Sequence, residues 1–117
     1  MLLYSIVLFA LAAVVGIYLV MRVFGGVLPP AGAAVFHGLF AASGLLLLLY
    51  AAFFAGAPAS EPVAIAAILL VGAAPGGFFV ARFPMRGKVP PKALAAIHAL
   101  VAVAGVGTLA AEVFNLI

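Results

Sequence analysis

The stretch VLPPAGAAVFHGLFAASG, from Val27 to Gly44, decides the fold because a second stretch repeats its pattern. That second stretch, KVPPKALAAIHALVAVAG, runs from Lys88 to Gly105. In both stretches a double proline is followed by a histidine near the start of a long apolar segment. An ionisable side chain in such a segment is costly unless it has a partner, so the repeat and the histidines need a common explanation.

The composition is that of an integral membrane protein. The chain has 117 residues, of which 70% are hydrophobic and only 6% are charged, too little polar surface for a soluble domain of this size. A helix needs about 20 apolar residues to cross the roughly 30 Å hydrocarbon core of a bilayer. The sequence therefore predicts an all-α membrane protein, with 1–117 as a single membrane domain. It predicts a bundle of four transmembrane helices at Leu2–Phe24, Ala31–Ala55, Pro62–Phe83 and Lys92–Phe114.

An internal repeat pairs residues that lie 61 positions apart. From Pro29 to Phe53, nine of 25 positions are identical in the shifted register. The proline and histidine matches carry this argument, because both residue types are much less frequent here than alanine and leucine. We predict a duplication of 1–56 as 62–117, which makes two helical hairpins. Each hairpin crosses the membrane twice, so the two copies share one orientation, as a parallel repeat.

The charged residues are divided between the two sides of the predicted bundle. The cations lie at the connections between helices 1 and 2 and between helices 3 and 4, and the acids lie at the opposite side. The positive-inside rule predicts that the cationic loops are cytoplasmic and that both termini face outward. We expect a bacterial inner-membrane protein without a cleaved signal peptide, because no basic segment precedes the first apolar stretch. The net charge of +3 therefore reflects topology, and no nucleic-acid partner is expected. The cations are Arg22, Arg82, Arg86, Lys88 and Lys92, and the acids are Glu61 and Glu112.

Five of the identical positions form one face of helix 2, and their five partners form one face of helix 4. They are spaced three, four, three and four residues apart, which is typical of the buried face of a helix. Small residues around each histidine indicate either close helix packing or a slot for a flat group. The two faces are Ala34, His37, Ala41, Gly44 and Leu48, and Ala95, His98, Ala102, Gly105 and Leu109.

A bis-histidine haem b accounts for this pattern best. His37 and His98 are the predicted axial ligands of one haem per protomer, at equal depth in the membrane. One nitrogen of a neutral imidazole binds iron and the other donates a hydrogen bond, here to the predicted acceptors, the carbonyls of Ala33 and Leu94. The absence of cysteine excludes iron–sulfur clusters and covalent c-type haem.

Small residues and cations complete the predicted site. Arg22 and Arg82, among the cations on the histidine side, are expected to neutralise the haem propionates. No catalytic residue is predicted. The predicted walls of the slot are Ala34, Ala41 and Gly44 with Ala95, Ala102 and Gly105, and Gly16 and Gly77 are expected to line it from helices 1 and 3.

The layout resembles that of membrane b-type cytochromes, in which histidines on two transmembrane helices clamp haem and glycines line the ring. The resemblance covers the two faces alone and points to no specific family. It implies an electron-transfer protein, and not an enzyme by itself. It also implies partners such as quinone, another redox protein, or other subunits of a respiratory or photosynthetic membrane complex.

Other functions remain open from the sequence. The first alternative is a cofactor-free structural or assembly subunit, in which the histidines contact protein. A chlorophyll-type pigment would need a single histidine on magnesium. A quinone or substrate site and a proton path are further alternatives. A small transporter would usually need an acid or a cation at mid-bilayer, and none is present in the sequence.

Overall fold

The computed structural model describes every residue from Met1 to Ile117 and contains four α-helices. All four are long and apolar enough to cross a membrane, as the sequence predicts. The predicted bounds of the first helix are confirmed, and so are the predicted starts of the second and fourth helices, Ala31 and Lys92. The other predicted ends differ by one or two residues. The helices are α1 (Leu2–Phe24), α2 (Ala31–Phe53), α3 (Glu61–Met85) and α4 (Lys92–Val113).

At the cationic end, α1 and α3 terminate in the same way. Gly26 and Gly87 have positive φ angles of 69° and 70°, a conformation that glycine adopts without steric cost and that commonly ends helices. One residue later, the N–H of Val27 donates to the carbonyl of Arg22 at 2.9 Å. The N–H of Lys88 donates to the carbonyl of Phe83 at 2.8 Å. Positions 61 residues apart therefore share this local conformation.

The opposite end of α3 explains why this helix begins one residue earlier than predicted. The hydroxyl oxygen of Ser60 accepts a hydrogen bond from the backbone N–H of Val63 at 3.4 Å, and Pro62 occupies the first turn. A serine cap satisfies an amide that has no partner within the helix, and proline is tolerated in the first turn. At its other end α3 continues through Pro84, so it ends at Met85.

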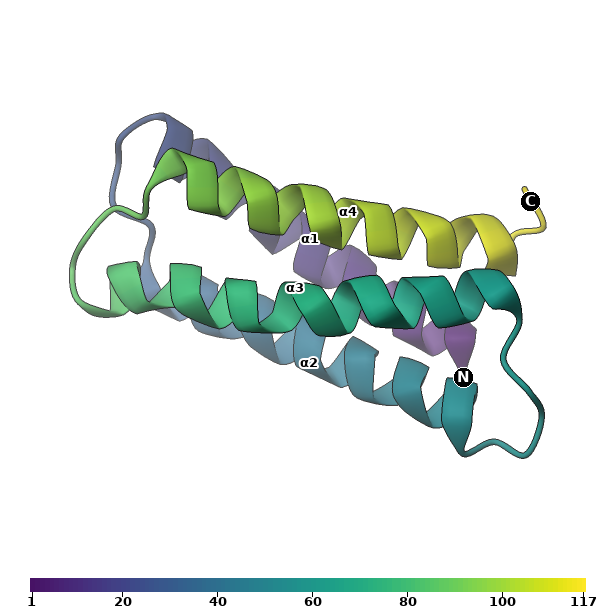
Figure 1. Cartoon of the computed structure of the whole chain (residues 1–117). Helices are drawn as coiled ribbons and strands as arrows, with labels where there is room; N and C mark the ends of the chain where they lie inside the picture. The colour runs from purple at the N-terminus through teal and green to yellow at the C-terminus, as the bar shows by residue number, and fades with distance from the viewer.

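The four helices form an elongated bundle in which each helix packs against two others (Figure 1). Helices α1 and α3 each contact α2 and α4, so α2 and α4 lie on one diagonal of the bundle. The bundle measures 44 × 22 × 19 Å, and its long axis matches a bilayer with its headgroups, about 40–45 Å thick. The two termini and the α2–α3 connection lie at one end, and the other two connections lie at the opposite end.

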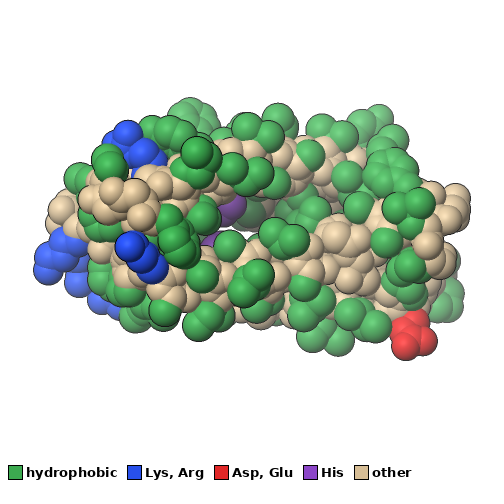
Figure 2. Space-filling view, turned by 90° about the horizontal axis from the view of Figure 1, so that it is seen from above, with side chains coloured by type: hydrophobic (Ala, Val, Ile, Leu, Met, Phe, Trp, Pro, Cys, Tyr) green, Lys and Arg blue, Asp and Glu red, His purple; other side chains and the backbone are tan.

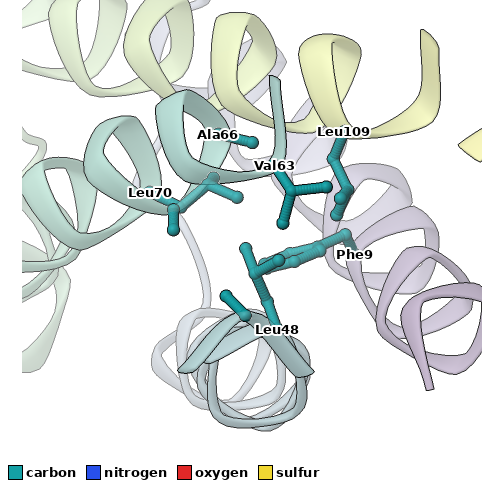
Figure 3. Close-up of a cluster of buried hydrophobic side chains, with 8 residues drawn as sticks. Phe9, Leu48, Val63, Ala66, Leu70 and Leu109 are labelled. Atoms are coloured by element: carbon teal, nitrogen blue, oxygen red, sulfur yellow. The ribbon is translucent and has the colours of Figure 1, made fainter. Parts of the chain in front are cut away.

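The apolar core lies in the half of the bundle that contains the termini. Phe9, Leu48, Leu70 and Leu109, one from each helix, meet there and are at most 5% exposed (Figure 3). The histidines lie between this core and the cationic end, where the neighbouring buried residues are alanines such as Ala12, Ala73 and Ala95. The apolar core cluster thus lies on the side of the histidines that is away from the cations.

Candidate functional site

The two histidines approach each other across the diagonal between α2 and α4. The ring centroids of His37 and His98 are 6.2 Å apart and the ring planes are inclined by 83°. Both side chains are half-buried. Figure 2 views the bundle from the side of α1 and α4, and histidine atoms are visible at the bottom of a hollow between two rows of side chains.

Each histidine is held by a backbone carbonyl of the helix that precedes its own in the chain. The Nδ1 of His37 lies 2.7 Å from the carbonyl oxygen of Ala12, and the Nδ1 of His98 lies 3.0 Å from that of Ala73. A carbonyl oxygen only accepts, so each Nδ1 carries the proton and donates it. When such an imidazole is neutral, its Nε2 keeps a lone pair that can bind a metal.

These acceptors differ from the predicted ones, the carbonyls of Ala33 and Leu94. The rings reach across to the adjacent helix because glycine stands four residues after each acceptor. Gly16 follows Ala12, and Gly77 follows Ala73. Residues four apart on a helix lie one above the other. Because Gly16 and Gly77 have no side chain, the second lone pair of the alanine carbonyl below each of them can accept a hydrogen bond from a histidine ring.

Gly16 and Gly77 accordingly make room for the imidazoles themselves. A Cβ atom on Gly16 would lie 3.0 Å from the Cε1 of His37, and one on Gly77 would lie 2.8 Å from the Cε1 of His98. The expectation that these glycines line a slot for a flat group is therefore revised: the space that they leave is taken by histidine.

Gly44 and Gly105 are also covered by protein, which differs from the predicted open slot. A Cβ atom on Gly44 would lie 3.2 Å from the ring of Phe9, and one on Gly105 would lie 2.6 Å from the Cγ of Leu70. Of the alanines predicted to form the slot with them, Ala95 is buried and the rest are half-buried. The half-buried alanines are Ala34, Ala41 and Ala102.

A cavity of about 210 Å³ lies beside His98, between α3 and α4. Its walls include Gly72, Gly76, Phe79 and Ile97. Pockets that bury ligands of drug size or larger usually measure about 300–1,000 Å³. The cavity beside His98 is therefore smaller than a pocket of that kind.

The five cations gather at the end of the bundle nearest the histidines (Figure 2). Arg22 is half-buried, and one of its terminal nitrogens donates to the carbonyl of Leu28 at 2.8 Å. Arg82 is exposed, with its guanidinium 5.4 Å from the ring centre of Phe79. Of the two arginines predicted to meet propionates, Arg22 is the more buried, and its guanidinium contacts the α1–α2 connection and Tyr18 of its own helix.

The donor set restricts which metal the site could hold. No group of three or more histidine, cysteine, aspartate or glutamate side chains lies close enough to share an ion. Zinc sites use three or four protein ligands. A low-spin haem with both free positions filled would need only two protein ligands, a number that His37 and His98 could supply.

The carbonyls of Ala12 and Ala73 are the functional groups that sequence reasoning missed. Their signal is present in the sequence as an alanine four residues before a glycine, at 12–16 and again at 73–77.

Comparisons of the chain with models of protein families, with curated proteins and with solved structures found no match. The function is therefore argued from the chain's own residues.

Proposed function

We propose that this chain is a membrane electron-transfer protein that binds one low-spin haem b between His37 and His98. The observation that carries the proposal is the pair of imidazoles, 6.2 Å apart between ring centroids and each anchored through Nδ1. Metal–imidazole bonds are about 2 Å long, so two rings that share one metal have centroids about 6 Å apart. The observed separation suits a shared iron.

The hydrogen bonds to Ala12 and Ala73 support this assignment. Histidines that bind metals almost always donate their second N–H to a carbonyl, a carboxylate or water, which fixes the tautomer and the ring orientation. Here the acceptors belong to helices α1 and α3, so all four helices contribute to the position of the ligand pair. A haem held by both imidazoles would supply one-electron transfer, and the two histidine ligands would leave no open position for oxygen chemistry.

We further propose that the chain is a parallel repeat of two hairpins with one haem per protomer. The support is the matched pairs 61 residues apart: the histidines, their alanine acceptors and the glycines beside the rings. With the cationic loops in the cytoplasm, the haem lies in the cytoplasmic half of a bacterial inner membrane. Quinone, a redox protein or subunits of a larger complex are the proposed partners.

One observation favours a second candidate, a structural or assembly subunit without a cofactor. Each bond from Nδ1 to a carbonyl joins the two helices of one hairpin, so the histidines could act as helix clamps alone. In the cytochrome the two Nε2 atoms bind iron, whereas in the structural subunit they bind no metal.

Optical spectra of the purified protein distinguish the two. After expression with a haem supply, the dithionite-reduced protein is expected to show a low-spin b-type spectrum, with one haem per chain. The spectrum should be lost in His37→Ala and in His98→Ala and kept in Ser43→Ala, an exposed position on α2. A folded wild-type protein that stays colourless, and that does not take up haem when it is added, overturns the cytochrome and favours the structural role.

A further inference from the structure

A second cavity, of about 420 Å³, lies at the end of the bundle that contains the termini (Figure 1). All four helices contribute to the wall of this end cavity, and residues 57–60 of the α2–α3 connection complete it. The lining residues from the helices are Leu2, Ala51, Val63, Glu112 and Val113. Pockets for small organic molecules usually measure about 300–1,000 Å³, so the end cavity is large enough for such a ligand.

The end cavity is separated from the histidines and is lined by both hairpins. Val63 also belongs to the apolar core, which lies between this cavity and the histidine pair. Two pairs of its lining residues are 61 positions apart: Leu2 pairs with Val63, and Ala51 pairs with Glu112. The first pair is apolar in both hairpins, whereas the second places a methyl group on one side and a carboxylate on the other. The wall of the end cavity therefore has one acidic side chain without an equivalent in the first hairpin.

The carboxylate of Glu112 has no partner within the chain. Its side chain is half-buried, whereas Glu61, at the same end of the bundle, is exposed. None of the side-chain hydrogen bonds of the structure involves Glu112. Its oxygens are not sealed in protein either, because the Nε of Arg22 is the only buried side-chain nitrogen or oxygen without a partner. The five cationic side chains lie at the opposite end, so a group that balances this charge comes from outside the chain (Figure 2).

The surroundings of Glu112 favour a cation as the ligand. Glu112 stands in the last turn of α4, where unpaired carbonyl groups carry partial negative charge and stabilise cations. The hydroxyl oxygen of Ser60 caps α3 with one lone pair, and its second lone pair is a further acceptor in the wall.

The lining also restricts the kind of cation. Ca²⁺ takes six to eight oxygen ligands, and no group of three or more acidic, histidine or cysteine side chains is present here. An ammonium group needs fewer acceptors, and Leu2, Val63 and Val113 offer apolar contacts to the carbon atoms attached to it.

We infer that the end cavity binds an organic cation, an ammonium group on a small apolar body, with Glu112 as its counter-ion. The inference does not depend on the proposed haem, because the apolar core separates the two sites. Two sources supply this chemistry: a water-soluble amine, and the ethanolamine head group of a lipid. The experiment below separates them.

The protein in lipid-free detergent is titrated calorimetrically with 2-phenylethylammonium and with 2-phenylethanol, which share one carbon skeleton and differ in charge. The wild type is expected to bind the ammonium about 10-fold more tightly, near the lower limit for a hydrogen bond to a charged group, because Glu112 is only half-buried. Glu112→Gln should bind both probes about equally. Glu61→Gln, a matched change at the exposed acid of the same end, should keep the preference.

Equal binding of the two probes by the wild type overturns the inference, and this comparison needs no variant to fold. Absence of ammonium binding also overturns it, as when the amino group of Met1 or water already satisfies the carboxylate. A preference that survives in Glu112→Gln would place the cation elsewhere and would overturn it as well.

Added lipid identifies the source of the ammonium group. If phosphatidylethanolamine displaces the probe from the wild type and phosphatidylglycerol does not, the ligand is the lipid head group. If neither lipid displaces the probe, the ligand is a water-soluble amine. Both results support the cation site, since each requires the ammonium group to occupy it.

Discussion

Gly77 lies directly against the imidazole of His98: a Cβ atom at this glycine would stand 2.8 Å from Cε1 and 3.3 Å from Nε2. Since the ring is also tied by Nδ1 to the carbonyl of Ala73, it has little freedom to withdraw. The His98 ring can therefore keep this orientation only while position 77 of α3 has no side chain.

Gly77→Ala is therefore expected to displace the His98 ring and lower haem affinity about 10- to 100-fold, the usual cost of disturbing a group that orients a metal ligand. Gly16→Ala should have a smaller effect, because its Cβ would meet the His37 ring at 3.0 Å. Haem titration of the purified variants measures both. The control is Gly72→Ala on α3, where a Cβ meets nothing within 4 Å. Unchanged affinity in Gly77→Ala would contradict the role given to this glycine.

Gly105→Ala is expected to destabilise the bundle without acting on the histidines. Its Cβ would lie 2.6 Å from the Cγ of Leu70, which is buried in the apolar core. Overpacking of a core costs about 1–3 kcal/mol, which lowers Tm by at least about 4 °C in a chain of this size. Thermal unfolding in detergent checks this against Gly107→Ala on the same helix, where the added Cβ has open space. Equal Tm values for the two variants would argue against this packing.

Ser5→Ala tests the one fully buried polar side chain. The hydroxyl of Ser5 donates to the carbonyl of Gly44 at 2.8 Å and joins α1 to α2. Such interhelical bonds in membranes are worth about 0.6 kcal/mol on average and at most about 1.7. We expect a small decrease in Tm, since the matched position in α3 is Ala66, where no hydroxyl is present. Ser43→Ala, at an exposed position, should leave Tm unchanged. A large decrease in Tm for Ser5→Ala would contradict the prediction and would mean that this hydrogen bond stabilises the bundle by more than the average for interhelical bonds.

Carbon monoxide tests the occupancy of both axial positions. If two histidines bind the iron, CO should not change the spectrum of the reduced wild-type protein, because no coordination position is open. Variants that lose one histidine, such as His37→Ala, are expected to bind CO in any fraction that retains haem. A rapid CO shift in the wild type would mean that one imidazole is not a ligand.

Reporter fusions test the predicted membrane orientation. If the cationic loops are cytoplasmic, as the positive-inside rule predicts, alkaline phosphatase fused after Ile117 is expected to be active and a green fluorescent protein fusion there is expected to be dark, because the C-terminus would face outward. The same reporters inserted at Gly87, between two of the cations, should give the opposite result. Reversed signals at both positions would place the cationic loops outside.

The sequence predicted the membrane class and the four helices well, because both depend on local composition. It also predicted that the face carrying the histidines turns inward: Gly44 and Leu48 on α2, and Gly105 and Leu109 on α4, are buried. Helical periodicity carries that information without knowledge of neighbours. Helix ends were predicted less well where a capping side chain sets the first residue of the helix, as Ser60 does for α3.

The partners of the histidines and the roles of the glycines could not be predicted in the same way. Which carbonyl the His37 ring reaches depends on the side-chain direction and on how closely α1 approaches α2, so Ala12 replaced the expected Ala33. Likewise, Gly44 and Gly105 were expected to leave space, whereas Phe9 and Leu70 from the adjacent helices occupy it.

By itself, the sequence determined that two histidines stand at matching depths on inward faces of two membrane helices, because spacing along a helix converts directly into depth and face. Only the tertiary structure decided that the two rings meet within 6.2 Å, that each is anchored by the helix beside it, and that Arg22 alone among the cations is half-buried with an unsatisfied nitrogen. Those properties arise between helices, where packing sets which groups touch, and no pattern within one helix encodes them.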